Sequence, residues 1–325
     1  HMLCYMPTLA LSNTIAFTNV KDRNEFPALR VWGTIGWIVA GLVVGGLGMS
    51  SSPKIFSLGG VSAIILGILC FALPKTPPPG KGKPIDMGTL LMADAFKLLK
   101  SVPFLVFIIC STLICIPLAY YYAYTAVYLP QIGFQATAST MALGQMSEIV
   151  FMLLVPFFFR KLGVKMMILV GMLAWVARYA LFSIGATDQV VWMVLVGVVL
   201  HGICYDFFFV TGFMYTDNKA PKEVRSQAQS LLVFFTQGVG MFFGYKIAGA
   251  KFFDVAPNSD ALVASIETPT FGFWESFGKM FLAEKPDVAQ PVMQSAMDSW
   301  KAFWMFPCMM ALIIAIVFAI SFFNI

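Results

Sequence analysis

The chain has 325 residues, of which 59% are hydrophobic and only 11% are charged, and its mean hydropathy is +0.82. Soluble domains carry about 25% charged residues, so this composition excludes an ordinary soluble enzyme or binding domain. The net charge of +5 comes largely from Lys and Arg in alternate connections between apolar segments, which is typical of membrane topology and not of a nucleic-acid-binding surface.

Nine apolar segments are long enough to cross a membrane, because a helix needs about 20 residues to span a hydrocarbon core of about 30 Å. In chain order they lie at approximately 3–19, 28–50, 53–74, 103–129, 136–159, 165–185, 190–214, 226–249 and 302–324. Their length and uniform apolar character predict helices, not the strands of a barrel. We therefore expect an all-α membrane protein with about nine transmembrane helices.

The connections 20–27, 75–102, 160–165 and 215–225 hold most of the basic residues, which places them in the cytoplasm. The connection 250–301 then lies outside. Within it Trp274, Phe277 and Phe281 share one helix face, which predicts either a short helix lying on the outer interface or a folded cap over the pore mouth.

The stretch "PKTPPPGKGKP" opens the connection 75–102 and predicts a flexible cytoplasmic linker. Three spans precede the linker and six follow it. We expect 1–74 to be the remainder of an N-terminal bundle and 103–325 to be a six-helix bundle with an outer loop at 250–301. Three further helices before residue 1 would complete two equal halves.

The motifs of soluble catalysis are absent: the sequence has no P-loop, no GxSxG and no HExxH. Its six cysteines all lie in apolar spans without a CxxC pair, and His201 with Cys204 is too sparse for a metal site. We expect no cofactor, no metal and no enzymatic activity.

Three ionisable residues lie deep in the predicted spans. At about 1.5 Å per residue, Glu148 is roughly 17 Å from its cytoplasmic end, Arg178 about 20 Å and Asp206 about 12–15 Å. Such residues are functional candidates by default. One carboxylate is expected to pair with Arg178 while the other takes up a proton, as a proton-coupled carrier requires; a static buried ion pair is the alternative.

Polar and aromatic residues accompany these charges at helical spacing. Such groups can stack a base or sugar ring and read its edges, although core packing is the alternative for any single aromatic residue. They are Gln145 beside Glu148; His201 with Tyr205; Arg30, Thr34 and Trp37 on a third helix; and Tyr120, Tyr121, Tyr122 and Tyr124 after Pro117. Arg30 lies near a cytoplasmic end, where it can also extend to the interface.

The stretches "YMPTLALSNTIAF", "FPALRVWGTIGW", "QMSEIVFMLLVPFFFRKLGVKMMILVGMLAWVARYALF" and "YDFFFVTG" resemble the nucleoside:proton symporters of the major facilitator superfamily. The resemblance implies that residue 1 corresponds to the fourth of twelve helices, so that about nine are present. It implies that Asp206 is a second proton site beside Glu148. The substrate contacts that it implies are Arg30, Thr34, Trp37, Gln145, Glu148, His201 and Tyr205.

The chain departs from the family at several of these positions. Trp37 stands where the family usually has phenylalanine, and His201 where it has tyrosine. Ala119 and Tyr122 replace a glutamine and an asparagine, so Tyr122 is expected to take over part of that contact.

The resemblance implies proton-coupled nucleoside uptake across a bacterial inner membrane by alternating access. The expected partners are a nucleoside, a proton and membrane lipid, with no nucleic acid, and the expected state is a monomer. A transporter of another small solute, such as a sugar or drug, and an inactive truncated fragment are the alternatives.

Overall fold

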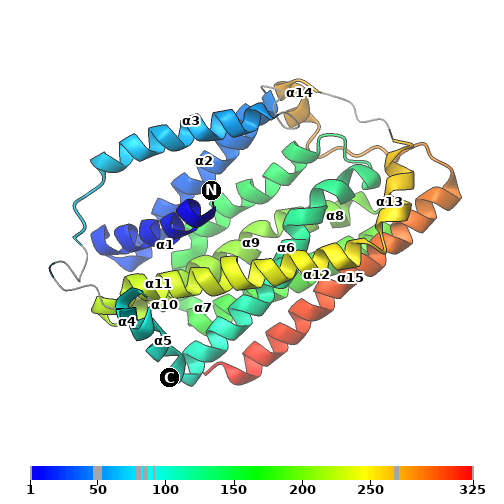
Figure 1. Cartoon of the computed structure of the whole chain (residues 1–325). Coiled ribbons are helices and arrows are strands. Elements are labelled where there is room, and N and C mark those ends of the chain that lie inside the picture. The colour runs from blue at the N-terminus through cyan, green and yellow to red at the C-terminus, as the bar shows by residue number, and fades with distance from the viewer. Residues whose placement is uncertain are drawn as a thin grey trace.

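The computed structural model describes residues 2–46, 53–77, 82, 87–90, 92–266 and 271–323, and this part is helical (Figure 1). Its only β-type pairing is one isolated bridge between Phe134 and Ala283. The predicted all-α fold class is therefore confirmed.

The chain begins with three long helices and a group of short ones. They are α1 (Met2–Asn19), η1 (Arg23–Glu25), α2 (Phe26–Gly46), α3 (Lys54–Leu69) with η2 (Cys70–Ala72), α4 (Met87–Leu90), α5 (Ala93–Phe96) and η3 (Lys97–Lys100). The rest comprises α6 (Val102–Ile132), α7 (Thr137–Thr187), α8 (Val191–Val199), α9 (His201–Tyr205), η4 (Asp206–Val210), α10 (Thr211–Lys219), η5 (Lys222–Val224), α11 (Arg225–Val233), η6 (Phe234–Gly240), α12 (Met241–Phe252), α13 (Ala256–Val263), α14 (Phe273–Gly278) and α15 (Gln290–Ser321).

Six helical segments of the described part are long and apolar enough to cross a membrane: 54–72, 102–132, 137–187, 191–219, 222–252 and 290–321. The segment 137–187 contains two predicted spans, because Gly163 has φ 67° and ψ 174° and breaks the helix between them. Only glycine adopts this left-handed backbone without steric strain. Together with α1 and α2, the helices account for the nine predicted spans.

The core forms where α15 packs against α7 and α6, and α12 packs against α6. Large aromatic side chains fill it, and two of them bond a neighbouring helix through their polar atoms. The Tyr128 hydroxyl donates a hydrogen bond to the Phe182 carbonyl at 2.8 Å, and the Trp300 indole donates one to Gln131 at 2.7 Å. Such pairing matters because an unsatisfied polar group is expensive in a membrane interior.

Two glycines let α6 and the η6–α12 helix approach closely. A Cβ at Gly240 would lie 2.5 Å from the Thr112 carbonyl oxygen, and one at Gly244 would lie 2.6 Å from the Ala119 Cβ. The Gly-x-x-x-Gly spacing therefore serves close helix packing here. A Cβ at Gly41, in the corresponding motif of α2, would meet no atom within 4 Å.

The first helices contact the later ones at specific places. α1 packs on α11, and α2 packs on α7. Helix α3 has no buried residue, so its apolar side chains are open along its whole length.

The connection 75–102 is not a linker throughout. Its final part folds into α5 and η3, and Ala95 is fully buried while the ring of Phe96 lies 6.4 Å from that of Phe235 on η6. The prediction of a flexible linker was wrong for 92–101 because apolar side chains there find a surface on α11. Residues 78–81, 83–86 and 91 lie outside the described residues.

The connection 250–301 is also more ordered than a loop. Helix α15 begins at Gln290 and not at 302, because its early turns bury Met293 and Met297 against the core. A short helix, α14, forms as expected with Trp274 and Phe277, but Phe281 lies beyond its end.

The segment that follows α14 docks on the turn between α6 and α7. The Glu284 amide donates a hydrogen bond to the Gly133 carbonyl at 3.0 Å, and the buried Thr140 hydroxyl donates one to the Met280 carbonyl at 2.9 Å. Gly133 has φ 116°, and a Cβ there would overlap the Glu284 backbone. Figure 1 places α13 and α14 at the end of the molecule opposite α4 and α5.

The close approach at Gly240 is testable by Gly240→Ala. The added methyl group must displace the Thr112 backbone, so we expect the free energy of unfolding in detergent to fall by about 1–3 kcal/mol. Gly238→Ala on the same η6 segment is the matched control, because its Cβ would come no closer than 3.8 Å to another side chain. Equal melting temperatures for the two variants would contradict the packing described.

Candidate functional site

A hydrogen bond joins α2 to α7 at the centre of the candidate site. The Thr34 hydroxyl donates to Glu148 Oε1 at 2.9 Å, and both side chains are only 7% exposed. Thr34 comes from the N-terminal helices and Glu148 from the later bundle. The two parts of the chain therefore share one buried polar contact.

The position of Glu148 depends on a close crossing of α7 and α9. A Cβ at Gly202 would lie 2.6 Å from the Ser147 backbone and 2.7 Å from the Glu148 amide. Ser147 secures the crossing, because its hydroxyl donates to the Val199 carbonyl at 2.6 Å and accepts the Gly202 amide at 3.0 Å. This crossing brings His201, next to Gly202, beside the helix that carries Gln145 and Glu148.

Arg30 points into the protein and not toward an interface. Its Nη2 donates to the Tyr205 hydroxyl at 3.2 Å, and its guanidinium lies 5.8 Å from the centre of the Phe213 ring. Both Glu148 and Asp206 lie within electrostatic range of this guanidinium. Arg30 is therefore a cation that both buried carboxylates sense, and the alternative in which it extends to the interface does not hold.

Asp206 is the first residue of η4, a π-helical segment within the span 191–219. The residue is fully buried, and neither carboxylate oxygen has a hydrogen-bond partner among the described residues. π-Helical segments inside α-helices are rare and frequently mark functional sites. A buried carboxyl group without a partner is suited to taking up a proton.

Three aromatic rings gather beside these charges. The His201 ring lies 5.8 Å from the Tyr205 ring and meets the Tyr122 ring edge-on at 6.3 Å. Behind it, Tyr121 stacks on His201 with a centroid distance of 5.2 Å and an angle of 17° between the planes. His201 Nδ1 is buried without a partner in the described part, while Tyr122 is 40% exposed.

The predicted pairing of Arg178 with a carboxylate was wrong. Within the described residues Arg178 forms no ion pair, and both of its terminal nitrogens lack a hydrogen-bond partner. Its Nε instead donates to the Gly197 carbonyl at 3.0 Å, and its guanidinium lies 4.2 Å from the centre of the Tyr121 ring. The side chain extends toward α8 and α6, whereas the carboxylates lie on the side of Arg30.

Two predicted contact residues lie at the margin of this cluster. Gln145 is half-buried one turn before Glu148. Trp37 is 68% exposed on α2, and among the described residues it forms no ring pair with the site tyrosines. The structure therefore brings together Arg30, Thr34, Glu148, His201, Tyr205 and Asp206, with Tyr122 and Gln145 beside them.

Sequence reasoning missed the residues that support the site. They are Ser147 and Gly202, which fix the α7–α9 crossing but are not ionisable. Their place in the sequence could have indicated them, because Ser147 directly precedes Glu148 and Gly202 directly follows His201.

The model of the nucleoside H+ symporter family matches residues 1–324 of this chain. The chain belongs to this family. The family and its relatives are transporters and not enzymes.

Curated relatives support the same family. The chain is 37% identical to the putative nucleoside transporter YegT of Escherichia coli over 334 residues, covering 99% of this chain and 71% of YegT. It is 30% identical to the nucleoside permease NupG of E. coli over 261 residues, covering 75% of this chain and 62% of NupG. The chain thus spans about two thirds of these relatives' length.

A crystal structure of a mutant of the nucleoside transporter NupG superimposes with a TM-score of 0.68 at 23% identity, covering 98% of this chain and 74% of NupG. This likeness shows the fold, a multi-pass helical bundle of the major facilitator type.

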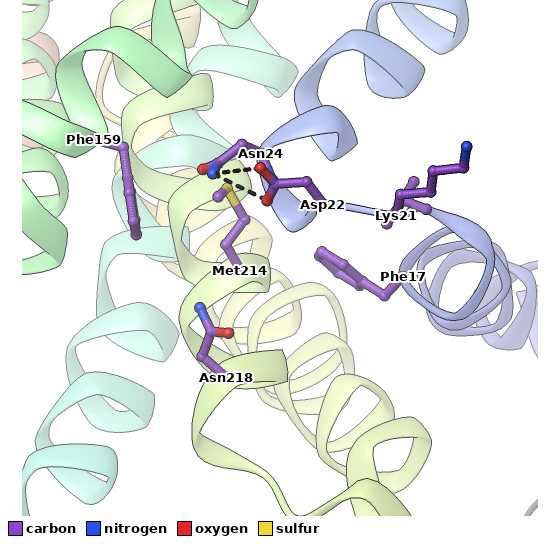
Figure 2. Close-up of a pocket in the computed structure, with 8 residues that line it drawn as sticks. Phe17, Lys21, Asp22, Asn24, Phe159, Met214 and Asn218 are labelled. Atoms are coloured by element: carbon purple, nitrogen blue, oxygen red, sulfur yellow. Dashed lines mark hydrogen bonds between the residues drawn. The ribbon is translucent and has the colours of Figure 1, made fainter.

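This member of the nucleoside H+ symporter family has a cavity of about 460 Å³ at the end that carries most of the basic connections. Figure 2 shows Asp22 and Asn24 from the α1–α2 connection on the side of Phe159 of α7 and Asn218 of α10, while the Lys21 side chain extends away from them. The backbone and side-chain amides of Asn24 donate to Asp22 and hold the pKa of this exposed carboxyl below its usual value. The cavity therefore lies where the N-terminal helices meet the later bundle.

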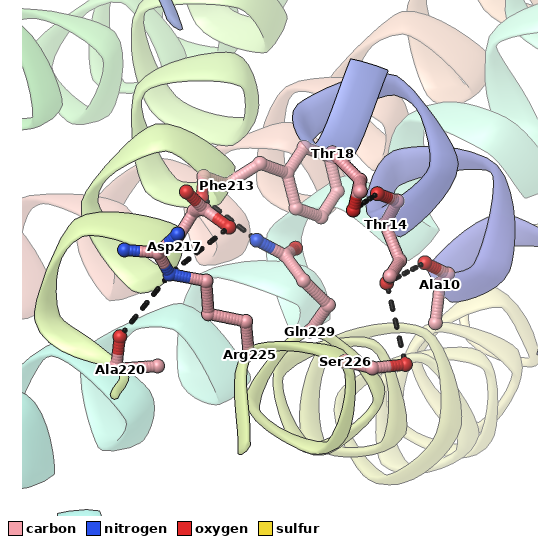
Figure 3. A network of polar contacts seen from close by, with 9 residues as sticks. All are labelled: Ala10, Thr14, Thr18, Phe213, Asp217, Ala220, Arg225, Ser226 and Gln229. Carbon is pink, nitrogen blue, oxygen red and sulfur yellow. Dashed lines mark hydrogen bonds and ion pairs between the residues drawn. The ribbon is translucent and has the colours of Figure 1, made fainter. Parts of the chain in front are cut away.

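A polar network joins the same two parts nearby (Figure 3). The Thr14 hydroxyl on α1 lies 3.4 Å from the Ser226 hydroxyl on α11. Arg225 Nε lies 3.9 Å from the buried Asp217 carboxylate and donates to the Ala220 carbonyl at 3.3 Å. These contacts fix the start of α11, on which α1 rests.

The crossing at Gly202 is testable by Gly202→Ala. The new methyl group must push α9 away from Ser147, which opens the surroundings of the buried Cys204. We expect a lower melting temperature and alkylation of Cys204 by N-ethylmaleimide about tenfold faster, measured by peptide mass spectrometry.

Gly249→Ala is the control, because its Cβ would make only an ordinary contact of 3.7 Å with the Tyr124 hydroxyl. If Cys204 of Gly202→Ala reacts at the rate of the control, the crossing does not hold the site together.

Proposed function

We propose that this protein carries nucleosides together with protons across a bacterial inner membrane by alternating access. The observation that carries the proposal is the polar cluster between α2 and α7–α10. In this cluster Thr34 binds Glu148, Arg30 binds Tyr205, and the Asp206 carboxylate has no hydrogen-bond partner among the described residues. Family membership supports the substrate class, and the geometry of the cluster supports the mechanism.

The substrate class agrees with the groups present. The rings of His201, Tyr205 and Tyr122 can stack a planar base, and His201 Nδ1 has no partner in the part of the chain that the structure describes. Aromatic faces with a few convergent polar groups are typical of sites for small polar ring compounds. Gln145, Arg30 and Thr34 supply donors and acceptors for the ribose hydroxyls or the base edge, and Trp37 lies on the same helix as the last two.

The coupling mechanism follows from an imbalance of charge. Two carboxylates, Glu148 and Asp206, lie within electrostatic range of one arginine, Arg30. Arginine stays protonated in proteins, so it offsets one negative charge and the second carboxylate is best accommodated with a proton. Glu148 and Asp206 are therefore the proton carriers in this proposal, and Arg178, which forms no ion pair with either among the described residues, takes no direct part.

Coupling requires that the proton and the nucleoside favour the same conformation, because a ligand shifts an equilibrium only by its differential affinity for the two states. The contacts that must change during alternation are those between the N-terminal helices and the later bundle. Thr34–Glu148 and Thr14–Ser226 are two such contacts. Because one chain contains all residues of this cluster, the transporter in this proposal works as a monomer. Its basic connections lie in the cytoplasm.

The proposal predicts proton-driven nucleoside accumulation by the full-length gene product in proteoliposomes. With an inward proton gradient we expect concentrative uptake of labelled uridine or adenosine, and its collapse when a protonophore is added. Glu148→Gln or Asp206→Asn should abolish accumulation against a gradient while leaving counterflow exchange, because a neutral side chain cannot release a proton.

Asp254→Asn on the outer connection is the matched control and should transport as the wild type does. Accumulation retained in both site variants would refute the assignment of the proton carriers. If sugars or drugs inhibit uptake but free nucleosides do not, the assignment of nucleosides as the substrate class is refuted.

The Thr34–Glu148 hydrogen bond gives a separate prediction. Thr34→Val keeps the shape of the side chain but removes the donor, and a hydrogen bond to a charged group contributes about 1.5–3 kcal/mol. We expect the KM for the nucleoside to rise about tenfold, whereas Thr34→Ser keeps the donor and stays near the wild-type value. Equal KM values for the two variants would show that the bond does not contribute to the binding-competent state.

A further inference from the structure

We infer that Arg178 and Tyr121 are positioning residues that act through His201 and thereby set which nucleoside bases the site accepts. The inference rests on the proposed function, because it concerns the substrate of the same site. Its basis is that the Tyr121 ring contacts both the Arg178 guanidinium and the His201 ring.

The ring of Tyr121 packs against two nitrogen-bearing groups. The Arg178 guanidinium carbon lies 4.2 Å from the centre of the ring, and the His201 ring stacks at 5.2 Å with 17° between the planes. The Tyr121 hydroxyl is buried and has no hydrogen-bond partner within the described residues. The ring face, and not the hydroxyl, is therefore the part of Tyr121 that the site uses.

The Arg178 side chain is held in place by its surroundings. Arg178 is fully buried, and its Nε donates to the Gly197 carbonyl at 3.0 Å. Phe182 lies close to Gly197, where a Cβ would come within 2.5 Å of its ring, and it also stacks on Tyr121 at 6.4 Å. The guanidinium therefore has a fixed place from which to hold the tyrosine ring.

The helix crossing fixes the backbone of His201 but does not fix its ring. The His201 Cβ lies 3.0 Å from the position that a Cβ on Gly144 would occupy, so the helix crossing fixes the start of this side chain. The ring nitrogen Nδ1 has no partner among the described residues. The imidazole plane is thus set by ring contacts, and the one with Tyr121 is the only parallel stack among those with Tyr121, Tyr122 and Tyr205.

The choice of arginine at 178 is informative. A buried cation without an anion is costly, and among the described residues Arg178 has no anionic partner. A planar guanidinium stacks on an aromatic face, whereas the ammonium group of lysine is a compact, strongly hydrated charge. Packing alone would be served equally well by an uncharged side chain of similar length, such as methionine.

The imidazole of His201 presents hydrogen-bonding nitrogens to a base, so its orientation decides which edge is matched. A site built to hydrogen-bond a substrate rejects analogues that leave its polar groups unpaired. Loosening the stack should therefore weaken selectivity between nucleosides, with little effect on the rate of the transport cycle.

Transport selectivity between uridine and adenosine tests the inference. Arg178→Met should raise the KM for the preferred nucleoside by about tenfold and bring the ratio of kcat/KM values close to that of His201→Ala, with kcat nearly unchanged. Arg178→Lys should lose most of the selectivity, because it keeps the charge without the planar group. Tyr121→Leu should behave as Arg178→Met does, and Tyr121→Phe should restore the wild-type ratio.

Double variants separate positioning from a general structural role. In a His201→Ala background, Arg178→Met should change the selectivity no further, since residues that act through one another are not additive. Additive effects, wild-type selectivity in Arg178→Met, or equal damage by Tyr121→Phe and Tyr121→Leu would each overturn the inference. Melting temperatures identify a misfolded variant; if Arg178→Met does not fold, Arg178→Lys and the Tyr121 pair decide.

The wild-type protein and His201→Ala in the same assay distinguish the two levels of proposal. Absence of nucleoside transport by the wild type would refute the proposed function. Nucleoside transport whose selectivity depends on His201 but not on Arg178 or Tyr121 would refute only the positioning role.

Discussion

The crossing of α7 and α9 at Gly202 is the constraint on which the site depends. Because Gly202 has no side chain, the two helices come close enough for the Ser147 hydroxyl of α7 to bond the Val199 carbonyl and the Gly202 amide. The same approach sets Glu148 where Thr34 of α2 can reach it and sets His201 in front of Tyr121. The positions of the Glu148 carboxylate and the His201 imidazole, and the contact of Glu148 with α2, thus all depend on the absence of a side chain at Gly202.

The two arginines near the site, the half-buried Arg30 and the fully buried Arg178, have different neighbours. Arg30 lies with the carboxylates and the Tyr205 hydroxyl, while Arg178 lies behind the aromatic rings. Membrane interiors hold few cations because each is costly to bury, so two of them around one site, from different helices and with different neighbours, indicate different uses. In the mechanism proposed here, Arg30 balances charges that change during the cycle, and Arg178 keeps the shape of the site constant.

Most of the fold was predictable from the sequence, because the length and hydropathy of a span depend on local composition. The charges at 160–165 predicted a connection between two spans, and the helix breaks there at Gly163. Glu148 was found because a carboxylate in an apolar stretch stands out. The pairing of Arg178 was not predictable, because depth along a helix gives no information on the direction in which a side chain points. The start of α15 was missed because its first turns are amphipathic: Met293 and Met297 face the core beside polar neighbours.

The docking of the outer connection at Gly133 changes how its length should be understood. Measured from the end of α12 to the start of α15 it is a long loop, and a free loop of that size would leave the two helix ends nearly independent. The hydrogen bond from Glu284 to Gly133 ties the chain down a few residues before Gln290. The outer ends of α6, α7 and α15 are therefore joined by a short tether, and much of the loop-closure entropy is already lost in this conformation. Any movement that opens the outer face must carry these three ends together or first release the tether.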